Sequence, residues 1–271
     1  MINNGLHKIP QEILSKVDVD QSRVLCGFGK FDYQFNPACG FLHAESVQFW
    51  HFEGVGNRLQ EVLVDFEKLF VFVESGAEVI LDLKFSNNFD FDRFDFESVL
   101  NEGSKLKLNV LIELEAEKNV SFDLHNKCVE KFATADLNLV YDLVDKSRIS
   151  LVCETSFEGS DNTGQMMING ILDDKAVGEV DGKIFISEKA NKTDSSLQQK
   201  VLLLSDDCRN LITPALEILT DDVKAAHGVS VSQVPADVMF YLNTRGLDLV
   251  SAKKLYKEAL KKELFKVENT I

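Results

Sequence analysis

Two side chains in the C-terminal third of the chain could bind a metal or a metal cluster. Cys208 ends the run Ser205-Asp-Asp-Cys208, directly after an apolar segment, and His227 follows an acidic pair at Asp221 and Asp222. Thiolates and neutral imidazoles are common protein ligands of iron. Nearby aspartates raise the pKa of a thiol, so Cys208 is not predicted to be an activated nucleophile, whereas a bound metal would stabilise its thiolate. A buried structural cysteine and a structural histidine are the competing interpretations.

Other potential ligands are weaker candidates. Glu217, Asp221 and Asp222 are close in sequence to His227 and are kept as supporting candidates, although acidic loops are common. Cys128 follows His125 by three residues, which could make a ligand pair on a turn, although a role without metal is the favoured interpretation, and Cys153 is predicted to lie in the core. Cys26 and Cys39 have no partner motif. No CxxC pair occurs, so no preformed zinc ribbon is predicted.

Composition narrows the function classes. The chain has 271 residues and a formal net charge of −15, so binding to a phosphate backbone is not expected. No apolar stretch reaches 18 residues and the N-terminus has no secretory pattern, which predicts a cytoplasmic protein with reduced thiols and no membrane span. The sequence contains no GxSxG, HExxH or GxGxxG motif. No intrinsic enzymatic activity is predicted.

The elements that must position these residues are mostly strands. From residue 58 to about 204, apolar and polar residues alternate with a period of two, as in Leu106 to Ala116, which is typical of strands with one buried face. Residues 86–97 alternate Phe with Asp and predict a strand with an acidic solvated face rather than a calcium loop. The strand-like runs come in pairs about 12 residues apart, and successive pairs are displaced by about 30. This spacing suits a β-helix, although a β-sandwich gives similar statistics.

Helices are predicted at both ends of the chain. Residues 6–17 suggest a short helix, and residues 22–57 suggest short strands and turns. Pro235 suits the start of a second helix, Gly246 its C-terminal cap, and Asp248 the N-cap of a third helix that runs to about residue 266. The last helix has apolar residues at helical spacing, and lysines occupy most of its remaining surface. These lysines either face solvent or meet an acidic partner. The predicted apolar positions are Ala252, Leu255, Tyr256, Ala259 and Leu260.

Four motifs in residues 202–246 resemble the C-terminal core of the SufB/SufD family of iron–sulfur cluster assembly proteins. They are LLLS at 202–205, P-x-LEI at 214–218, DDVK-x-x-HG at 221–228 and FYL-x-x-RG at 240–246. The resemblance implies a mainly β fold, namely a right-handed parallel β-helix with a C-terminal helical segment and a short mixed N-terminal region. The implied division is 1–57, 58–232 and 233–271.

The resemblance also implies roles for the candidate ligands. Cys208 falls on the position where SufB-type sequences carry a cysteine implicated in cluster assembly. His227 falls on the family histidine, but Gly228 replaces the glutamate of SufB-type sequences and is SufD-like. Subunits of this family pair through the C-terminal end of their β-helices, so a homodimer would bring two copies of Cys208 and His227 together. A transient iron–sulfur cluster is the implied cofactor.

The implied partners are a SufC-like ABC ATPase and a second SufB/SufD subunit, in a homodimer or a heterodimer. The ATPase would dock on the C-terminal helices. Two functions follow: a cluster assembly scaffold, or a SufD-like structural subunit that binds no cluster. A β-solenoid with a carbohydrate or surface role is a third, weaker reading. The candidate docking residues are Phe240, Tyr241, Arg245, Lys254, Lys257 and Lys261.

Overall fold

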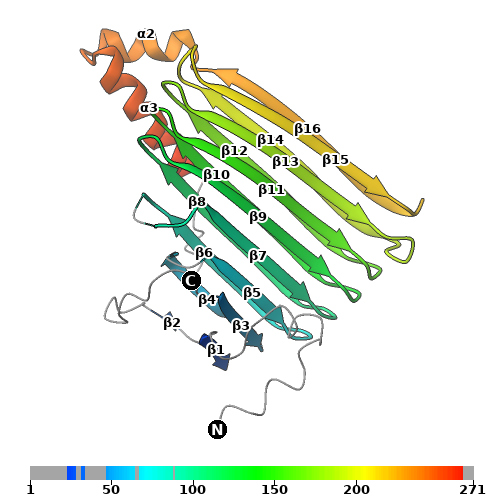
Figure 1. The fold of residues 1–271 in the computed structure, drawn as a ribbon. Helices are drawn as coiled ribbons and strands as arrows, with labels where there is room; N and C mark the ends of the chain where they lie inside the picture. Colours follow the sequence, from blue (N-terminus) through cyan, green and yellow to red (C-terminus); the bar gives the residue numbers. More distant parts are fainter. Residues whose placement is uncertain (1–22, 29–31, 34–46, 65–66, 88, 265–271) are drawn as a thin grey trace.

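The computed structural model describes residues 23–28, 32–33, 47–64, 67–87 and 89–264. Within them the chain winds into a parallel β-helix made of two facing sheets of eight strands each (Figure 1). Odd-numbered strands form one sheet and even-numbered strands form the other, which ends at β16. The odd sheet, here called sheet A, contains β1 (Arg23–Phe28), β3 (Val47–Glu53), β5 (Lys68–Val73), β7 (Arg93–Leu100), β9 (Asn119–Cys128), β11 (Arg148–Phe157), β13 (Val177–Ile186) and β15 (Arg209–Ile218).

The even sheet, here called sheet B, faces sheet A across a shared core. Each strand inside a described sheet pairs in parallel with the strands one coil before and after it, as Leu139 of β10 does with Val110 and Ile168, and the end strands pair on one side only. The prediction of a β-helix is therefore confirmed, and the β-sandwich alternative is wrong. Sheet B contains β2 (Asp32–Tyr33), β4 (Asn57–Leu63), β6 (Glu78–Phe85), β8 (Lys105–Leu114), β10 (Thr134–Leu143), β12 (Thr163–Leu172), β14 (Thr193–Leu203) and β16 (Val223–Gln233).

The corners of the β-helix repeat with the coil. Ala116, Asp145 and Asp174 lie 29 residues apart and all have positive φ angles, which allow the sharp turn between sheets. Successive corners are also linked, because the side-chain carboxylate of Asp145 accepts a hydrogen bond from the Ala116 N–H, one coil earlier, at 2.9 Å. Asp tolerates the left-handed conformation better than most residues, which explains its recurrence at this corner.

The core is filled by the inward-facing half of each strand. Leu106, Leu108, Val110 and Ile112 of β8 are all 1% exposed or less, as the period of two predicts. Tyr141 also lies inside, and a Cβ atom on Gly170 would lie only 2.2 Å from its ring, so this neighbour must be glycine. A cluster of phenylalanines fills the next coils toward the N-terminus: Phe85, Phe89, Phe91, Phe94 and Phe122.

The Phe/Asp segment differs from its predicted form. The strand begins only at Arg93, because residues 86–92 form the connection between β6 and β7. Phe89 and Phe91 nevertheless reach the core from this connection, stacking at 4.3 Å between ring centroids. The alternation of Phe with Asp does not distinguish a strand from this connection, because a loop that buries every second residue has the same pattern.

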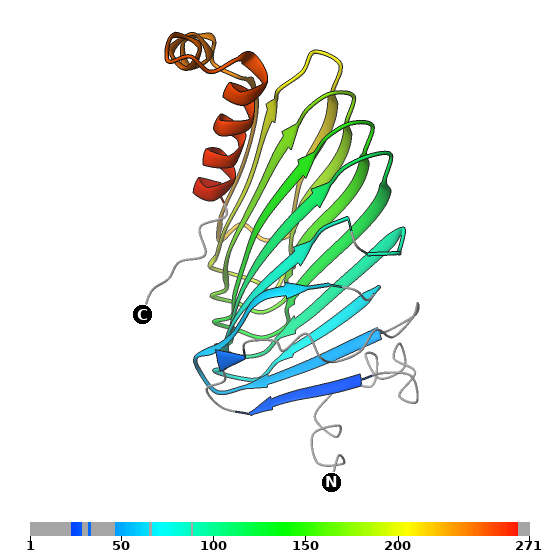
Figure 2. The same cartoon turned by 90° about the vertical axis from the view of Figure 1, so that its left-hand side faces the viewer.

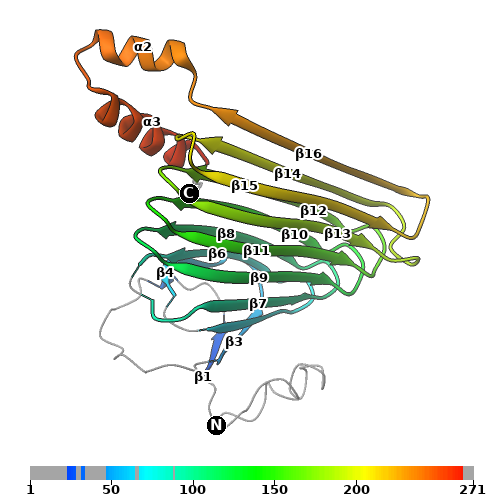
Figure 3. The same ribbon diagram turned by 45° about the horizontal axis from the view of Figure 1, so that its top comes forward.

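Two helices follow the last strand. Helix α2 (Ala236–Thr244) begins after Pro235, and Gly246 ends it with a φ of 89°, as predicted. Helix α3 (Leu249–Leu264) is N-capped by Asp248, whose Oδ1 accepts a hydrogen bond from the Ser251 N–H at 2.7 Å. α3 lies along the outer side of the β-helix, across the ends of successive strands, and α2 projects beyond the stack (Figures 2 and 3).

The N-terminal predictions are covered only in part. The helix proposed for residues 6–17 lies outside the described residues, as does Cys39. Within residues 22–57, the short strands β1, β2 and β3 are present and already pair with strands of the two sheets. No helix within the described residues is long and apolar enough to cross a membrane.

Candidate functional site

Cys208 lies at the corner between β14 and β15. Its side chain is buried, and its Sγ is 3.0 Å from the carbonyl oxygen of Ser205 and 3.5 Å from that of Leu172. Burial raises the pKa of the Cys208 thiol, and the nearby Asp173 carboxylate acts in the same direction. The thiol is therefore protonated at neutral pH and turned toward carbonyl groups of its own chain. In this arrangement Cys208 is not a reactive nucleophile.

The buried thiols predict a loss of stability at high pH. Cys128, Cys153 and Cys208 are all buried, and burial raises the pKa of Cys153 to about 12. On unfolding, each thiol returns to a pKa of about 8.5, so above that pH the unfolded chain releases protons that the folded chain retains. The contribution of Cys153 to stability is thus complete below about pH 8.5, and it decreases by about 1.4 kcal/mol per pH unit up to its folded pKa.

The measurement is urea unfolding of the reduced protein between pH 8 and pH 11, for the wild type and for Cys153→Ala. The free energy of unfolding should fall less steeply with pH for the variant than for the wild type. The two slopes should differ by about 1.4 kcal/mol per pH unit, which is the contribution of the Cys153 thiol. Equal slopes for the two proteins would show that the Cys153 thiol ionises as easily in the folded chain as in the unfolded one.

His227 occupies a different place, in the middle of the last strand. In β16 it pairs with Leu197 of β14, so it lies on the side of the sheet that faces the core. Leu197 is fully buried, but His227 is exposed, because β16 is the last strand of sheet B and no further coil covers it. The family resemblance placed His227 near the C-terminal end of the β-helix, but the residue pattern of one strand does not show that no further coil covers it.

The open end is apolar. Val229 and Val231 pair with the buried Gln199 and Val201, yet they are 46% and 54% exposed. Ile218 of β15 pairs with the buried Ile186 and is 37% exposed, and Leu219 of the last corner is 50% exposed. Within the described sheets, β15 and β16 each have a strand on one side only, so their other backbone edges are unpaired. Exposed apolar edge strands are surfaces on which another strand can pair. We call the surface formed by β15 and β16 the open end.

Within one chain, the candidate ligands do not meet. Gln233 contacts Asp206 at 3.3 Å, next to the Cys208 corner, and His227 lies six positions before Gln233. At about 3.3 Å per residue, His227 is therefore roughly 20 Å along the strand from that corner. No group of three or more His, Cys, Asp or Glu side chains within the described ranges is arranged to hold a metal ion.

The supporting acidic candidates lie at the opposite corner. Glu217 is near the end of β15 and pairs with Lys183 at 3.0 Å. Asp221 and Asp222 are exposed in the turn that follows. This turn joins the end of β15 to the start of β16, whereas Cys208 directly precedes β15. These carboxylates are closer to His227 than to Cys208, and none of them contacts the thiol.

Helix α2 presents the first part of the predicted docking surface. None of its side chains is buried, and Phe240 and Tyr241 are 71% and 55% exposed. The Arg245 guanidinium lies 5.1 Å from the centre of the Tyr241 ring. Lys254 of α3 is exposed, as are the apolar residues Leu249, Val250 and Leu255 of the same helix.

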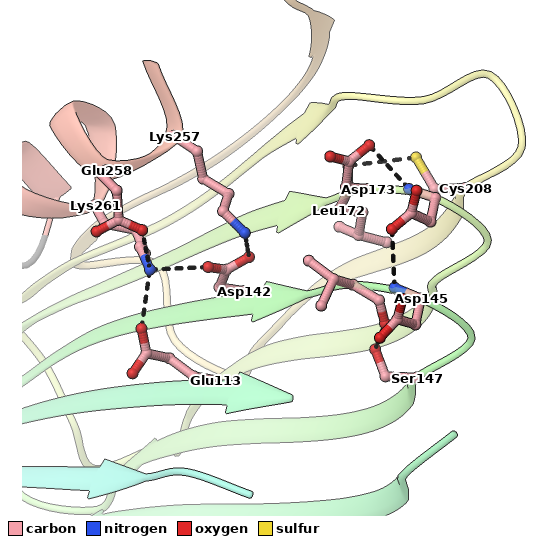
Figure 4. A network of polar contacts seen from close by, with 12 residues as sticks. Glu113, Asp142, Asp145, Ser147, Leu172, Asp173, Cys208, Lys257, Glu258 and Lys261 are labelled. Carbon is pink, nitrogen blue, oxygen red and sulfur yellow. Dashed lines mark hydrogen bonds and ion pairs between the residues drawn. The ribbon is translucent and has the colours of Figure 1, made fainter. Parts of the chain in front are cut away.

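Lys257 and Lys261 are placed differently from their predicted role. Both reach from α3 to the outer face of sheet B, where Lys257 pairs with Asp142 at 3.1 Å and Lys261 with Asp142 at 3.0 Å (Figure 4). Lys261 also contacts Glu113 at 2.9 Å. Their side chains are only 17% and 13% exposed, so these two lysines are not available to an acidic partner in this conformation.

The buried side of α3 also needs correction. Ala252, Tyr256 and Leu260 face the β-helix, but Leu255 and Ala259 are exposed. The side of α3 that faces the β-helix also carries Lys253, Lys257 and Lys261. Their ammonium groups form ion pairs with acidic residues on the sheet B side of the β-helix. Sequence reasoning missed these acidic residues, although Glu113 and Asp142 occupy the same position in successive coils and Asp173 lies two residues beyond the next such position, Ile171, which is the signal that could have found them.

The described residues form a parallel β-helix with an apolar open end and two C-terminal helices. The family model of the SufBD core domain, from the SUF system for FeS cluster assembly, matches residues 71–260. This range covers most of the chain, from β5 to α3. The chain therefore belongs to the SufBD family of iron–sulfur cluster assembly proteins, as the sequence motifs predicted.

Individual relatives agree with this assignment. An iron–sulfur cluster assembly SufBD family protein of Synechocystis sp. is 35% identical over 94 residues, which is 35% of this chain and 21% of that protein. The iron–sulfur cluster assembly protein SufD of Escherichia coli is 31% identical over 117 residues, or 42% of this chain and 28% of that protein. SufD of Bacillus subtilis is 32% identical over 97 residues, or 36% and 22%. The chain thus matches less than a third of the length of these relatives.

Proposed function

We propose that this chain is a subunit of a cytoplasmic iron–sulfur cluster assembly complex, in which two β-helices pair through their open ends and a cluster is assembled at the paired surface. The observation that supports the proposal most strongly is the exposure of the core-facing side of β16, including His227, Val229 and Val231. A partner strand would cover these residues and satisfy the free backbone edge. The partner in this proposal is a second copy of the chain.

Pairing supplies what one chain lacks. A single chain offers one exposed imidazole on the open end and no group of three ligands among its described residues. Two copies related by a twofold axis present two equivalent imidazoles, because such an interface uses the same surface of both subunits. His227 is therefore the primary candidate ligand. Cys208 would join it only after the corner between β14 and β15 opens and the metal displaces the thiol proton, which passes to solvent.

The C-terminal helices have a separate role in the proposal. Phe240, Tyr241 and Val250 form an exposed apolar surface, rimmed by Arg245 and Lys254, that suits docking of a SufC-like ABC ATPase. ATP hydrolysis belongs to that partner, and the chain itself performs no catalysis. Lys257 and Lys261 are left out of the docking surface because they are paired with Asp142.

The test is anaerobic reconstitution with iron and sulfide, followed by absorption spectroscopy and iron counting. The wild-type protein should bind iron and show sulfide-to-iron charge-transfer bands. His227→Ala and Cys208→Ala should each lower the bound iron at least about tenfold, since loss of a ligand removes a metal bond. Cys128→Ala is the matched control, because Cys128 is buried in the core and should not affect iron.

A SufD-like structural subunit that binds no cluster is the second candidate. The burial of the Cys208 thiol and its raised pKa favour it. It predicts a protein that pairs with a SufB-like subunit and binds no iron alone. A folded wild-type protein without bound iron would therefore select this second function. Iron that is retained in both His227→Ala and Cys208→Ala would contradict the proposed ligands.

A further inference from the structure

Helix α3 contacts the β-helix through a small apolar cluster and through a row of ion pairs. Among its described side chains only Ala252 is fully buried, and its apolar contact is limited to a small cluster in which Tyr256 and Leu260 pack on the outer face of sheet B. The residues that receive them are Ile171, Leu202 and Leu204. By comparison, three lysines of α3 contact oxygen atoms of the β-helix.

The three lysines are spaced to match successive strands. Lys253, Lys257 and Lys261 are four residues apart, so they advance about 6 Å per step along the helix. Strands of a sheet are about 4.8 Å apart, and α3 crosses their ends. Lys253 accordingly meets the end of β12, at Asp173 (4.0 Å), and donates a 2.5 Å hydrogen bond to the carbonyl oxygen of Leu204 after β14.

The next two lysines meet the strands that follow. Lys257 and Lys261 both contact Asp142 of β10, and Lys261 also contacts Glu113 of β8. The Asp142 side chain is 6% exposed, so it depends on the two ammonium groups to offset the cost of burying its charge. A groove of about 420 Å³ lies beside this contact. On the β-helix side, the carboxylates that line it include Glu115, Asp173 and Asp174.

We propose that α3 is a detachable strap, latched onto the acidic row Glu113, Asp142 and Asp173 by Lys253, Lys257 and Lys261. The strap opens as one unit while the β-helix stays folded. Gly246, with its φ of 89°, separates α3 from α2, and α2 has no buried side chain that would resist the movement. When α3 moves about Gly246, its exposed Val250 and Leu255 change their position relative to Phe240 and Tyr241 of α2. The latch would thereby control whether these exposed apolar side chains are presented together.

Hydrogen–deuterium exchange of the full chain tests the strap. In the wild type, amides of residues 253–264 should share one opening rate that is faster than exchange in β9 to β13. The double variant Lys257→Glu/Lys261→Glu replaces the two ammonium groups at Asp142 with carboxylates, which repel Asp142 and Glu113. It should speed exchange in α3 roughly a hundredfold without changing exchange in the sheets. Lys257→Met/Lys261→Met keeps the stems, removes the charges and should act in the same direction.

Lys262→Glu is the matched control, because Lys262 is the exposed neighbour of Lys261 in the same helical turn. Exchange in α3 should remain within about twofold of wild type in this variant. Unchanged α3 exchange in both double variants would overturn the proposal, since apolar contacts would then hold the helix. Faster exchange in β9 to β13 together with α3 would also overturn it, because α3 would then be part of the cooperative core. Neither result depends on iron, pairing or an ATPase.

Discussion

The double variant Val229→Glu/Val231→Glu should be monomeric at concentrations where the wild-type protein is a dimer. Both valines lie on the core-facing side of β16 and are about half exposed, so pairing of two open ends would bury them. Two carboxylates in such an apolar interface would have to be buried without partners, and pairing should weaken at least about a hundredfold.

Sedimentation velocity over a concentration series measures this effect. Val250→Glu is the control, since Val250 is 77% exposed on α3 and the substitution adds a carboxylate away from the open end. This control should pair like the wild type. A Val229→Glu/Val231→Glu protein that dimerises with wild-type affinity would show that β16 is not in the interface.

The second large effect concerns the core. Phe122→Ala should lower the free energy of unfolding by about 3–5 kcal/mol, because it leaves a cavity where a fully buried ring packs. The ring of Phe122 lies 4.9 Å from that of Phe85 between centroids and 6.0 Å from that of Phe94. Each coil of the β-helix stacks on the next, so the loss is felt by the neighbouring coils as well.

Urea unfolding at neutral pH measures this loss. Phe132→Ala is a suitable control, since Phe132 is 53% exposed at a corner. At position 132, phenylalanine and alanine must adopt the same positive φ. Its effect should stay within about 1 kcal/mol. A loss below about 1 kcal/mol for Phe122→Ala would indicate that the surrounding phenylalanines close the cavity at little cost.

The fold was predictable because two of its signals are local. The period of two along β8 gives one buried face, and the spacing of about 30 residues between strand pairs gives the coil. These patterns could not separate a β-helix from a β-sandwich, because both bury one face of each strand. The family motifs in residues 202–246 made the choice. The Phe/Asp segment misled because Phe89 and Phe91 reach the core from a connection rather than from a strand.

The candidate site was predictable only as a set of residue types. Cys208 and His227 stand out by their motifs, but the sequence does not show that one thiol is buried at a corner while one imidazole is exposed on the last strand. The lysines of α3 show the same limit. A helical pattern identifies the face that carries Lys257 and Lys261, but their partner Asp142 is 115 residues away from Lys257 in sequence. Only the coil places that carboxylate under the helix.

The central claim is that an iron–sulfur cluster is assembled between two paired open ends. The most direct test is to count iron and sulfide after anaerobic reconstitution in the dimeric wild type and in the monomeric Val229→Glu/Val231→Glu variant. We predict a cluster in the wild-type dimer and at least about tenfold less iron in the folded monomer, because each monomer provides only part of the ligand set. Equal iron in the monomer and the dimer would contradict the claim.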